Sequence, residues 1–124
     1  MSSTILARNF LLRRDTRRRV MFGAIVECRG VAQKVKVVDF SPSSVRLDGI
    51  KSLAAGDPIQ LSLAPDLVLE GEVTWYVWHK AGLKFLKPLT DDHPAYVFLA
   101  EQAQAIERIR TLALVSLAKD RARS

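Results

Sequence analysis

Seven consecutive residues near the N-terminus hold the chain's strongest potential for ligand chemistry. They read Arg13-Arg14-Asp15-Thr16-Arg17-Arg18-Arg19, and every basic residue among them is an arginine. A guanidinium group is a planar fork that binds phosphate through two hydrogen bonds and stacks on purine rings. The run therefore suits an anionic nucleotide. A solvated basic segment, or a segment that contacts nucleic acid or a membrane surface, has the same charge, so charge alone does not decide.

A second polar cluster follows about twenty residues after the run and reads Asp39-Phe40-Ser41-Pro42-Ser43-Ser44. Aspartate and serine beside a turn often bind local backbone donors, which is a purely structural role. In the presence of a ligand, an aspartate accepts two hydrogen bonds from the N1 and N2 edge of guanine, and a serine hydroxyl reaches the base or a phosphate. These residues by themselves leave both roles open.

Composition indicates one folded domain. The chain has 124 residues, of which 48% are hydrophobic and 26% charged, with a net charge of +6. Residues 1–19 hold six arginines against one acid, Asp15, so the excess positive charge is concentrated there.

The single cysteine, Cys28, excludes an internal disulfide and cannot by itself build a structural metal site. Neither a membrane-spanning stretch nor a secretory signal is present in the sequence, which predicts a cytoplasmic protein without membrane insertion.

The elements that must position these clusters are mainly strands. From Val20 onward, short runs rich in β-branched and aromatic residues alternate with turn formers, which is typical of a small barrel that pairs every strand edge. We expect six strands, at residues 20–28, 31–39, 44–48, 58–63, 67–78 and 81–86. In the fifth, Val73, Trp75 and Val77 share one parity with Leu67 and Leu69, so we expect Trp75 to face the core.

A helix is predicted to close the chain. Thr90, Asp91 or Asp92 suits its cap and Pro94 its first turn, and an apolar stripe follows (Tyr96, Leu99, Ala103, Ile106, Ile109, Ala113). Its second half is apolar over an arc broader than one contact needs, which leaves open burial against the barrel alone or a homodimer through this helix. The predicted organisation is a flexible lead at 1–12, a barrel with its arginine segment at 13–88, and a helix with a tail at 89–124.

Taken together, these features resemble a PilZ domain, the bacterial receptor module for cyclic di-GMP. The family's RxxxR motif matches Arg14 and Arg18 behind Arg13, and an offset alignment pairs Arg13 with Arg17. Its D/N-x-S-x-x-G motif matches Asp39 and Ser41, with Ser44 at the glycine position. A looser downstream pattern also matches (Gly71, Val73, Trp75, Gly82, Phe85). The resemblance covers about residues 10 to 88 and implies a six-stranded antiparallel barrel with a C-terminal helix.

The resemblance also implies roles for individual residues. Arg14 and Arg18 would hold phosphates and stack on guanines, while Asp39 and Ser41 would read a guanine edge. Arg13 would add a stacking surface. Glycine accepts a positive φ and lets a ligand approach closely, so Ser44 is expected to weaken the site. The implied function is a non-catalytic receptor that requires no cofactor and regulates a downstream protein partner by changing its surface.

Two other functions remain open. The first is a PilZ-like adaptor that has lost the nucleotide and acts only through protein contacts, as Ser43, Ser44 and the apolar helix suggest. The second is a small barrel that binds nucleic acid through its basic arm, which is disfavoured because no strand interleaves aromatic residues with lysines. His79 and His93 have no metal-ligand spacing, and no nucleophile or phosphate-loop motif is present, so we expect neither a metal site nor an enzyme.

Overall fold

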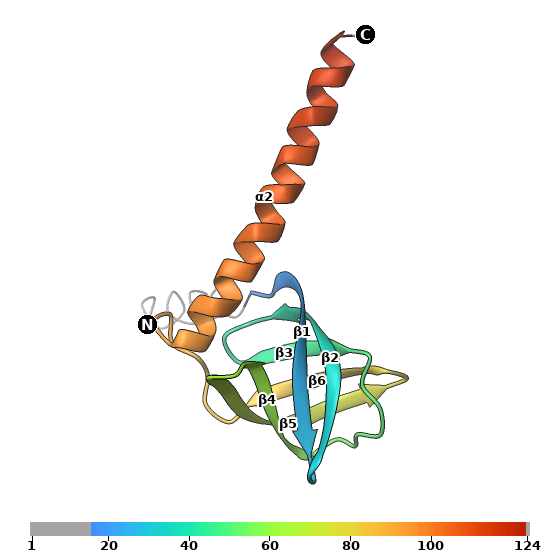
Figure 1. The fold of residues 1–124 in the computed structure, drawn as a ribbon, viewed down its shortest axis with the longest axis vertical. Coiled ribbons are helices and arrows are strands. Elements are labelled where there is room, and N and C mark those ends of the chain that lie inside the picture. Colours follow the sequence, from blue (N-terminus) through green and yellow to red (C-terminus); the bar gives the residue numbers. More distant parts are fainter. Residues whose placement is uncertain (1–15, 124) are drawn as a thin grey trace, which may run out of the picture.

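Six antiparallel strands close into a barrel, and one long helix follows them (Figure 1). The structure is a computed structural model that describes residues 16–123, with side chains described as far as Val115. The barrel order is β1-β2-β3-β6-β5-β4, and pairing of β1 with β4 closes it. The elements are β1 (Arg18–Cys28), β2 (Val31–Phe40), β3 (Ser44–Asp48), β4 (Pro58–Ala64), β5 (Leu67–Val77), β6 (Lys80–Phe85) and α2 (Pro94–Arg123).

Buried apolar residues alternate with exposed polar residues along the strands of the barrel, as the sequence predicted. In β2, Val35 and Val37 are buried while Lys34 and Lys36 are exposed, because successive strand residues point to opposite faces. The mainly β architecture with its C-terminal helix is therefore confirmed. One boundary matters for function: β1 begins at Arg18, so the last two arginines of the run belong to a strand.

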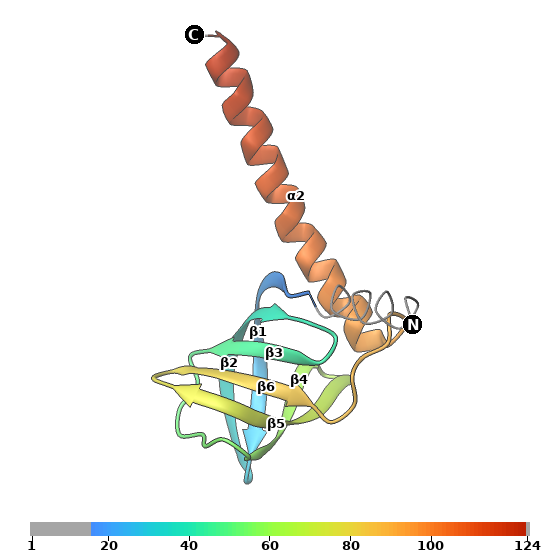
Figure 2. The same cartoon turned by 180° about the vertical axis from the view of Figure 1, so that it is seen from behind.

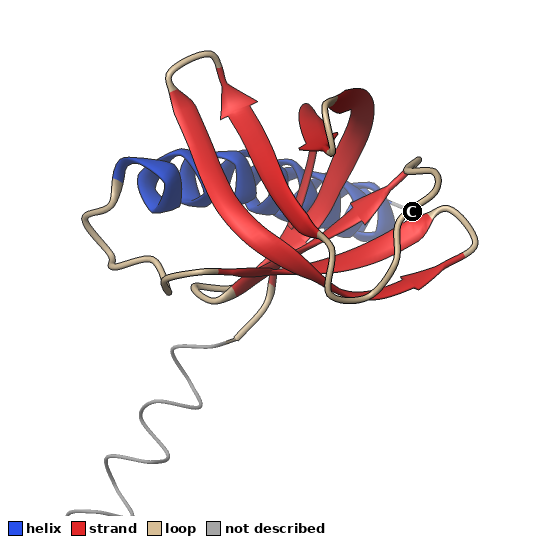
Figure 3. Cartoon of the chain, turned by 90° about the horizontal axis from the view of Figure 1, so that it is seen from below, coloured by secondary structure: helices blue, strands red, loops and turns tan. Residues whose placement is uncertain are grey.

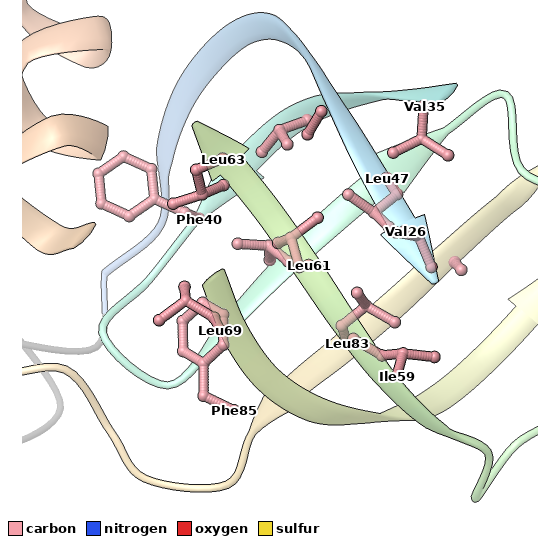
Figure 4. Close-up of a cluster of buried hydrophobic side chains, with 14 of the residues drawn as sticks. Val26, Val35, Phe40, Leu47, Ile59, Leu61, Leu63, Leu69, Leu83 and Phe85 are labelled. Carbon is pink, nitrogen blue, oxygen red and sulfur yellow. The ribbon is translucent and has the colours of Figure 1, made fainter. Parts of the chain in front are cut away.

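The barrel is filled by aliphatic and aromatic side chains (Figure 4). The largest fully buried side chains include Phe40, Leu47, Ile50, Leu61, Leu83 and Leu99. Phe40 lies at the end of this core next to the helix, where its ring meets Tyr96 edge-on at 6.0 Å between centroids. A second edge-on pair, Phe22 with Phe98 at 5.3 Å, also joins the barrel to α2. The barrel and the start of the helix thus share one core.

The cap of α2 differs from the prediction. His93 caps the helix: its Nδ1 atom accepts a hydrogen bond from the backbone N–H of Ala95 at 3.1 Å, and its carbonyl accepts one from Val97 at 3.0 Å. The Thr90 hydroxyl instead binds the carboxylate of Asp92. The predicted cap at Thr90, Asp91 or Asp92 was therefore wrong, because an imidazole acceptor one residue before the helix fills the place that hydroxyl and carboxylate side chains usually take.

Only the first third of α2 packs on the barrel. Ala95, Leu99 and Ala103 are buried, and Ile106 is half-buried. Beyond that point the helix leaves the barrel and projects away from it (Figures 1 and 2). Viewed from below, the helix runs behind the strands of the barrel (Figure 3). Within the part of the chain that the structure describes, no helix has the length and apolar character needed to span a membrane.

Candidate functional site

The described part of the arginine run meets the second polar cluster near the end of β2. The Nε atom of Arg17 donates to Oδ1 of Asp39 at 2.7 Å, and Nη1 of Arg17 donates to the Ser44 hydroxyl at 2.6 Å. Asp39 lies near the end of β2, and its side chain is only 10% exposed. Arg17, from the N-terminal run, therefore contacts both Asp39 and Ser44, the residue at the glycine position of the D/N-x-S-x-x-G motif.

Arg46 is a further member of this site, and sequence reasoning missed it. Its Nε donates to Oδ2 of Asp39 at 2.5 Å, so the two carboxylate oxygens are divided between two guanidinium groups. The hydrogen bond to Asp39 raises the pKa of Arg46 above its ordinary value, which keeps it charged. Arg46 is the backbone partner of Asp39 across the β2–β3 hairpin. Counting pairs outward from the turn at Pro42 would have found it.

The arginines at the start of β1 divide between two faces of the sheet. Arg18 bonds to the carboxylate of Glu107 on α2, with nitrogen–oxygen distances of 3.1–3.3 Å. Arg19 is the backbone partner of Asp39 in β1–β2 pairing and is exposed. Arg18 thus does not lie with Asp39, whereas Arg17 does. Arg13 and Arg14 fall outside the described residues, so the predicted role of the Arg14–Arg18 pair stays a prediction.

The serines of the second motif build the turn between β2 and β3. Ser41 is fully buried, and its hydroxyl bonds to the Ser43 and Ser44 hydroxyls at 3.3 and 3.1 Å. The backbone of Ser41 also donates to the Ser44 carbonyl at 2.8 Å. Buried in this way, Ser41 positions Ser44 and does not itself reach the surface. Ser44 is the member of the trio that meets Arg17.

Ser44 is not strained where the motif usually has glycine. Among the described residues, the non-glycines with positive φ are Arg29, Ser52 and Trp78. Ser44 is the first residue of β3 and has the extended backbone that any residue adopts. The conformational penalty expected from the sequence is therefore absent. Ser44 still differs from glycine by its hydroxymethyl group, which occupies space in the site and accepts a hydrogen bond from Arg17.

The prediction that Trp75 faces the core was wrong. The pairing of β5 with β6 shifts between Val73 and Trp75, and this bulge reverses the parity of the residues that follow. Val73 is buried, Trp75 is 38% exposed, and Tyr76 turns inward to pack against the core. Because a bulge depends on the pairing of two strands, alternation along β5 alone did not reveal it.

The outward turn of Trp75 places its indole beside the arginine site. Directly paired residues run across four strands from Asp39 through Arg46 and Gly82 to Trp75. A methyl group at Gly82 would overlap the indole ring, so only glycine lets the ring lie on β6. A shallow pocket of about 240 Å³ results, and it is lined by Arg17, Ser44, Val45, Arg46, Thr74, Trp75, Gly82 and Leu83. It combines two guanidinium groups with an aromatic ring.

Comparison with known proteins supports the fold. No protein-family model and no curated protein matches the chain. Among solved structures, the chain is similar to the crystal structure of the PilZ domain of CeSA from a cellulose-synthesizing bacterium, with a TM-score of 0.52 and 12% identity. The match covers 74% of this chain and 98% of that domain. At this identity the likeness concerns architecture alone, and it agrees with the barrel that the sequence motifs predicted. The chain therefore has the fold of a PilZ domain.

Proposed function

We propose that this protein is a non-catalytic receptor for cyclic di-GMP that binds its ligand on the outer face of β2, β3, β6 and β5. The observation that carries the proposal is the contact of Arg17 with both Asp39 and Ser44 on a barrel of PilZ fold. In this arrangement the Arg17 guanidinium, a group that binds phosphate, is hydrogen-bonded directly to the Asp39 carboxylate, a group that can accept hydrogen bonds from the guanine edge. A cyclic dinucleotide offers phosphates and guanine edges at similarly short spacing.

Ligand binding would exchange partners within the site. A ligand phosphate would replace Asp39 as the acceptor for Arg17, and the N1–H and N2–H donors of guanine would take the vacated oxygen of Asp39. Arg46 would keep the other oxygen and hold the carboxylate in place. Charge-assisted hydrogen bonds contribute about 1.5–3 kcal/mol each, so the exchange is favourable when the ligand supplies more of them than are lost. Arg13 and Arg14 are proposed to supply the additional guanidinium groups.

The output of the receptor is proposed to pass through Arg18. Arg18 directly follows Arg17 in the chain, and its side chain donates hydrogen bonds to the Glu107 carboxylate on α2. In this proposal, the backbone that connects Arg17 to Arg18 shifts when Arg17 moves to a phosphate, and the contact with α2 changes with it. A downstream protein that recognises this side of α2 would then distinguish the liganded from the free state.

Isothermal titration calorimetry with cyclic di-GMP tests the proposal, with cyclic di-AMP as the matched control ligand. Both ligands carry the same phosphate ring, but adenine lacks the N1–H and N2–H donors that Asp39 would accept. We expect heat with a one- or two-site isotherm for cyclic di-GMP and at least tenfold weaker binding of cyclic di-AMP, about 1.4 kcal/mol. Absence of heat from both ligands at high concentration would reject the receptor function.

Tryptophan fluorescence should report the ligand through Trp75. The pocket is smaller than the roughly 300–1,000 Å³ of sites that enclose a whole drug-sized ligand, so it suits one base, which the indole can stack on. Stacking of a base on an aromatic side chain contributes about 1–3 kcal/mol, so Trp75→Ala should weaken binding by about 5-fold or more. Trp75→Phe should abolish the emission change that ligand causes. Trp78→Phe is the control, because Trp78 is 86% exposed in the β5–β6 turn and should leave that change intact.

A second function, an adaptor without nucleotide, has one observation in its favour. Both oxygens of Asp39 and the Ser44 hydroxyl already have partners within the protein. A site that satisfies its own groups in this way can be purely structural. In that case the barrel would serve to present α2 and its neighbouring surface to a protein partner.

Ser44→Gly separates the two functions. The substitution removes the hydroxyl that holds Arg17 and opens the space where the family motif has glycine. If the protein is a receptor, releasing one hydrogen bond of about 1 kcal/mol should strengthen binding of cyclic di-GMP by about fivefold in the same titration. If neither the original protein nor the glycine variant binds, the adaptor function is favoured.

A further inference from the structure

The projecting part of α2 presents apolar side chains to water. Ile109 is 66% exposed and Leu112 is 68% exposed, although both lie in a helix of 30 residues whose first turns pack on the barrel. At 1.5 Å per residue, that helix is about 45 Å long, and little of it touches the barrel (Figures 1 and 2). A helical segment that leaves its domain is marginally stable in water unless another surface covers it.

These apolar residues form one stripe at helical spacing. Ala105 and Ile106 are followed by Ile109 and then by Leu112 and Ala113, at steps of three and four residues. The sequence continues the step with Ser116 and Leu117. Such spacing places the residues along one side of a helix, which is the pattern of a seam between two paired helices.

The charges of α2 indicate what covers the stripe. The sequence from 94 to 107 has two acids, Glu101 and Glu107, and no basic residue. From 108 to 123 it has one acid, Asp120, and five basic residues (Arg108, Arg110, Lys119, Arg121, Arg123). Two such helices in parallel would place like charges together, whereas in antiparallel orientation the basic half of each would lie along the acidic half of the other. The helix is therefore complementary to a reversed copy of itself.

We propose that two copies of this chain pair through antiparallel α2 helices. The two-fold axis passes at Arg110, so that Ile109 and Leu112 of one copy lie next to Ile109 and Leu112 of the other. This register brings residue 101 of each helix close to residue 119 of its counterpart, which the sequence occupies with Glu101 and Lys119. The two barrels then lie at opposite ends of the helix pair. The pairing depends only on α2 and is independent of the proposed ligand.

Mass measurement of the full chain tests whether the stripe is an interface. Light scattering or sedimentation should give twice the chain mass of 13.8 kDa, and Leu112→Glu should return the protein to a monomer. Leu114→Glu is a matched control, because Leu114 is also 68% exposed on the same helix but lies off the stripe. It should stay dimeric. A monomer at all concentrations, or equal effects of the two variants, would overturn the proposal. Circular dichroism of Leu112→Glu should show that the barrel remains folded.

Cysteine cross-linking tests the orientation. In a Cys28→Ser background, Glu101→Cys and Lys119→Cys proteins are prepared separately, mixed and oxidised. Antiparallel pairing predicts disulfides between the two different variants and few within either variant alone. A parallel pair would give the reverse, with each variant linking to itself, and that result would overturn the antiparallel arrangement. A monomeric mixture without cross-links would overturn the pairing itself.

Discussion

Arg17→Ala is expected to weaken binding of cyclic di-GMP by about 10- to 100-fold, whereas Arg18→Ala should change it by less than about threefold. The two residues are adjacent in the sequence and identical in chemistry, but only Arg17 lies on Asp39 and Ser44. Arg18 bonds to Glu107 on α2, where it is part of a surface ion pair. Calorimetric titration of both variants under the same salt conditions measures the difference.

The converse outcome is equally informative. If Arg18→Ala abolished binding and Arg17→Ala did not, the motif would be aligned on Arg14 and Arg18, and the ligand would have to draw Arg18 away from Glu107. Glu107→Gln distinguishes a direct role of Arg18 from an effect through the helix. It breaks the ion pair but leaves every arginine in place. With the ligand on Arg17, Glu107→Gln should change the affinity for cyclic di-GMP by no more than about threefold, because a surface ion pair can couple to the ligand only weakly.

Phe40→Ala should lower the free energy of unfolding by roughly 3–5 kcal/mol, the range measured for truncation of buried aromatic residues. Phe40 is 1% exposed and fills the end of the barrel where the core continues into α2 through Tyr96. Removal of the ring leaves a cavity and breaks that contact. A domain of this kind is stable by about 5–15 kcal/mol, so the change removes a large fraction of the total. Urea unfolding followed by circular dichroism measures it.

Val77→Ala provides the comparison for this stability measurement. Val77 is also in the barrel but is more than half exposed, so its truncation should change the free energy of unfolding by less than about 0.5 kcal/mol. A loss below about 1 kcal/mol in Phe40→Ala would contradict the shared core of barrel and helix. Because Asp39 precedes Phe40, the variant should also bind cyclic di-GMP more weakly as β2 loosens.

Local pattern was sufficient for the elements of this protein. Strand β2, with lysines outside and valines inside, and strand β3 after Pro42 have bounds in the structure within one residue of those expected. Helix α2 begins at Pro94, the residue that the sequence placed in the first turn. These features depend on the period of the apolar residues and on residues that break a strand, both of which are properties of consecutive residues. The motif residues Asp39, Ser41 and Ser44 could likewise be identified from the sequence alone.

The tertiary structure decided which of these residues meet. Arg17 rather than Arg18 lies on Asp39, because neighbouring side chains point to opposite faces of the sheet where the chain enters β1 at Arg18. Trp75 lies outside the barrel because a bulge against β6 reverses the parity of β5. Arg46 joins the site through its pairing with Asp39 across the hairpin. The sequence by itself determined the strands, the helix and the arginine chemistry, whereas strand register decided the direction of each side chain, since register arises from pairing between segments that are distant in the chain.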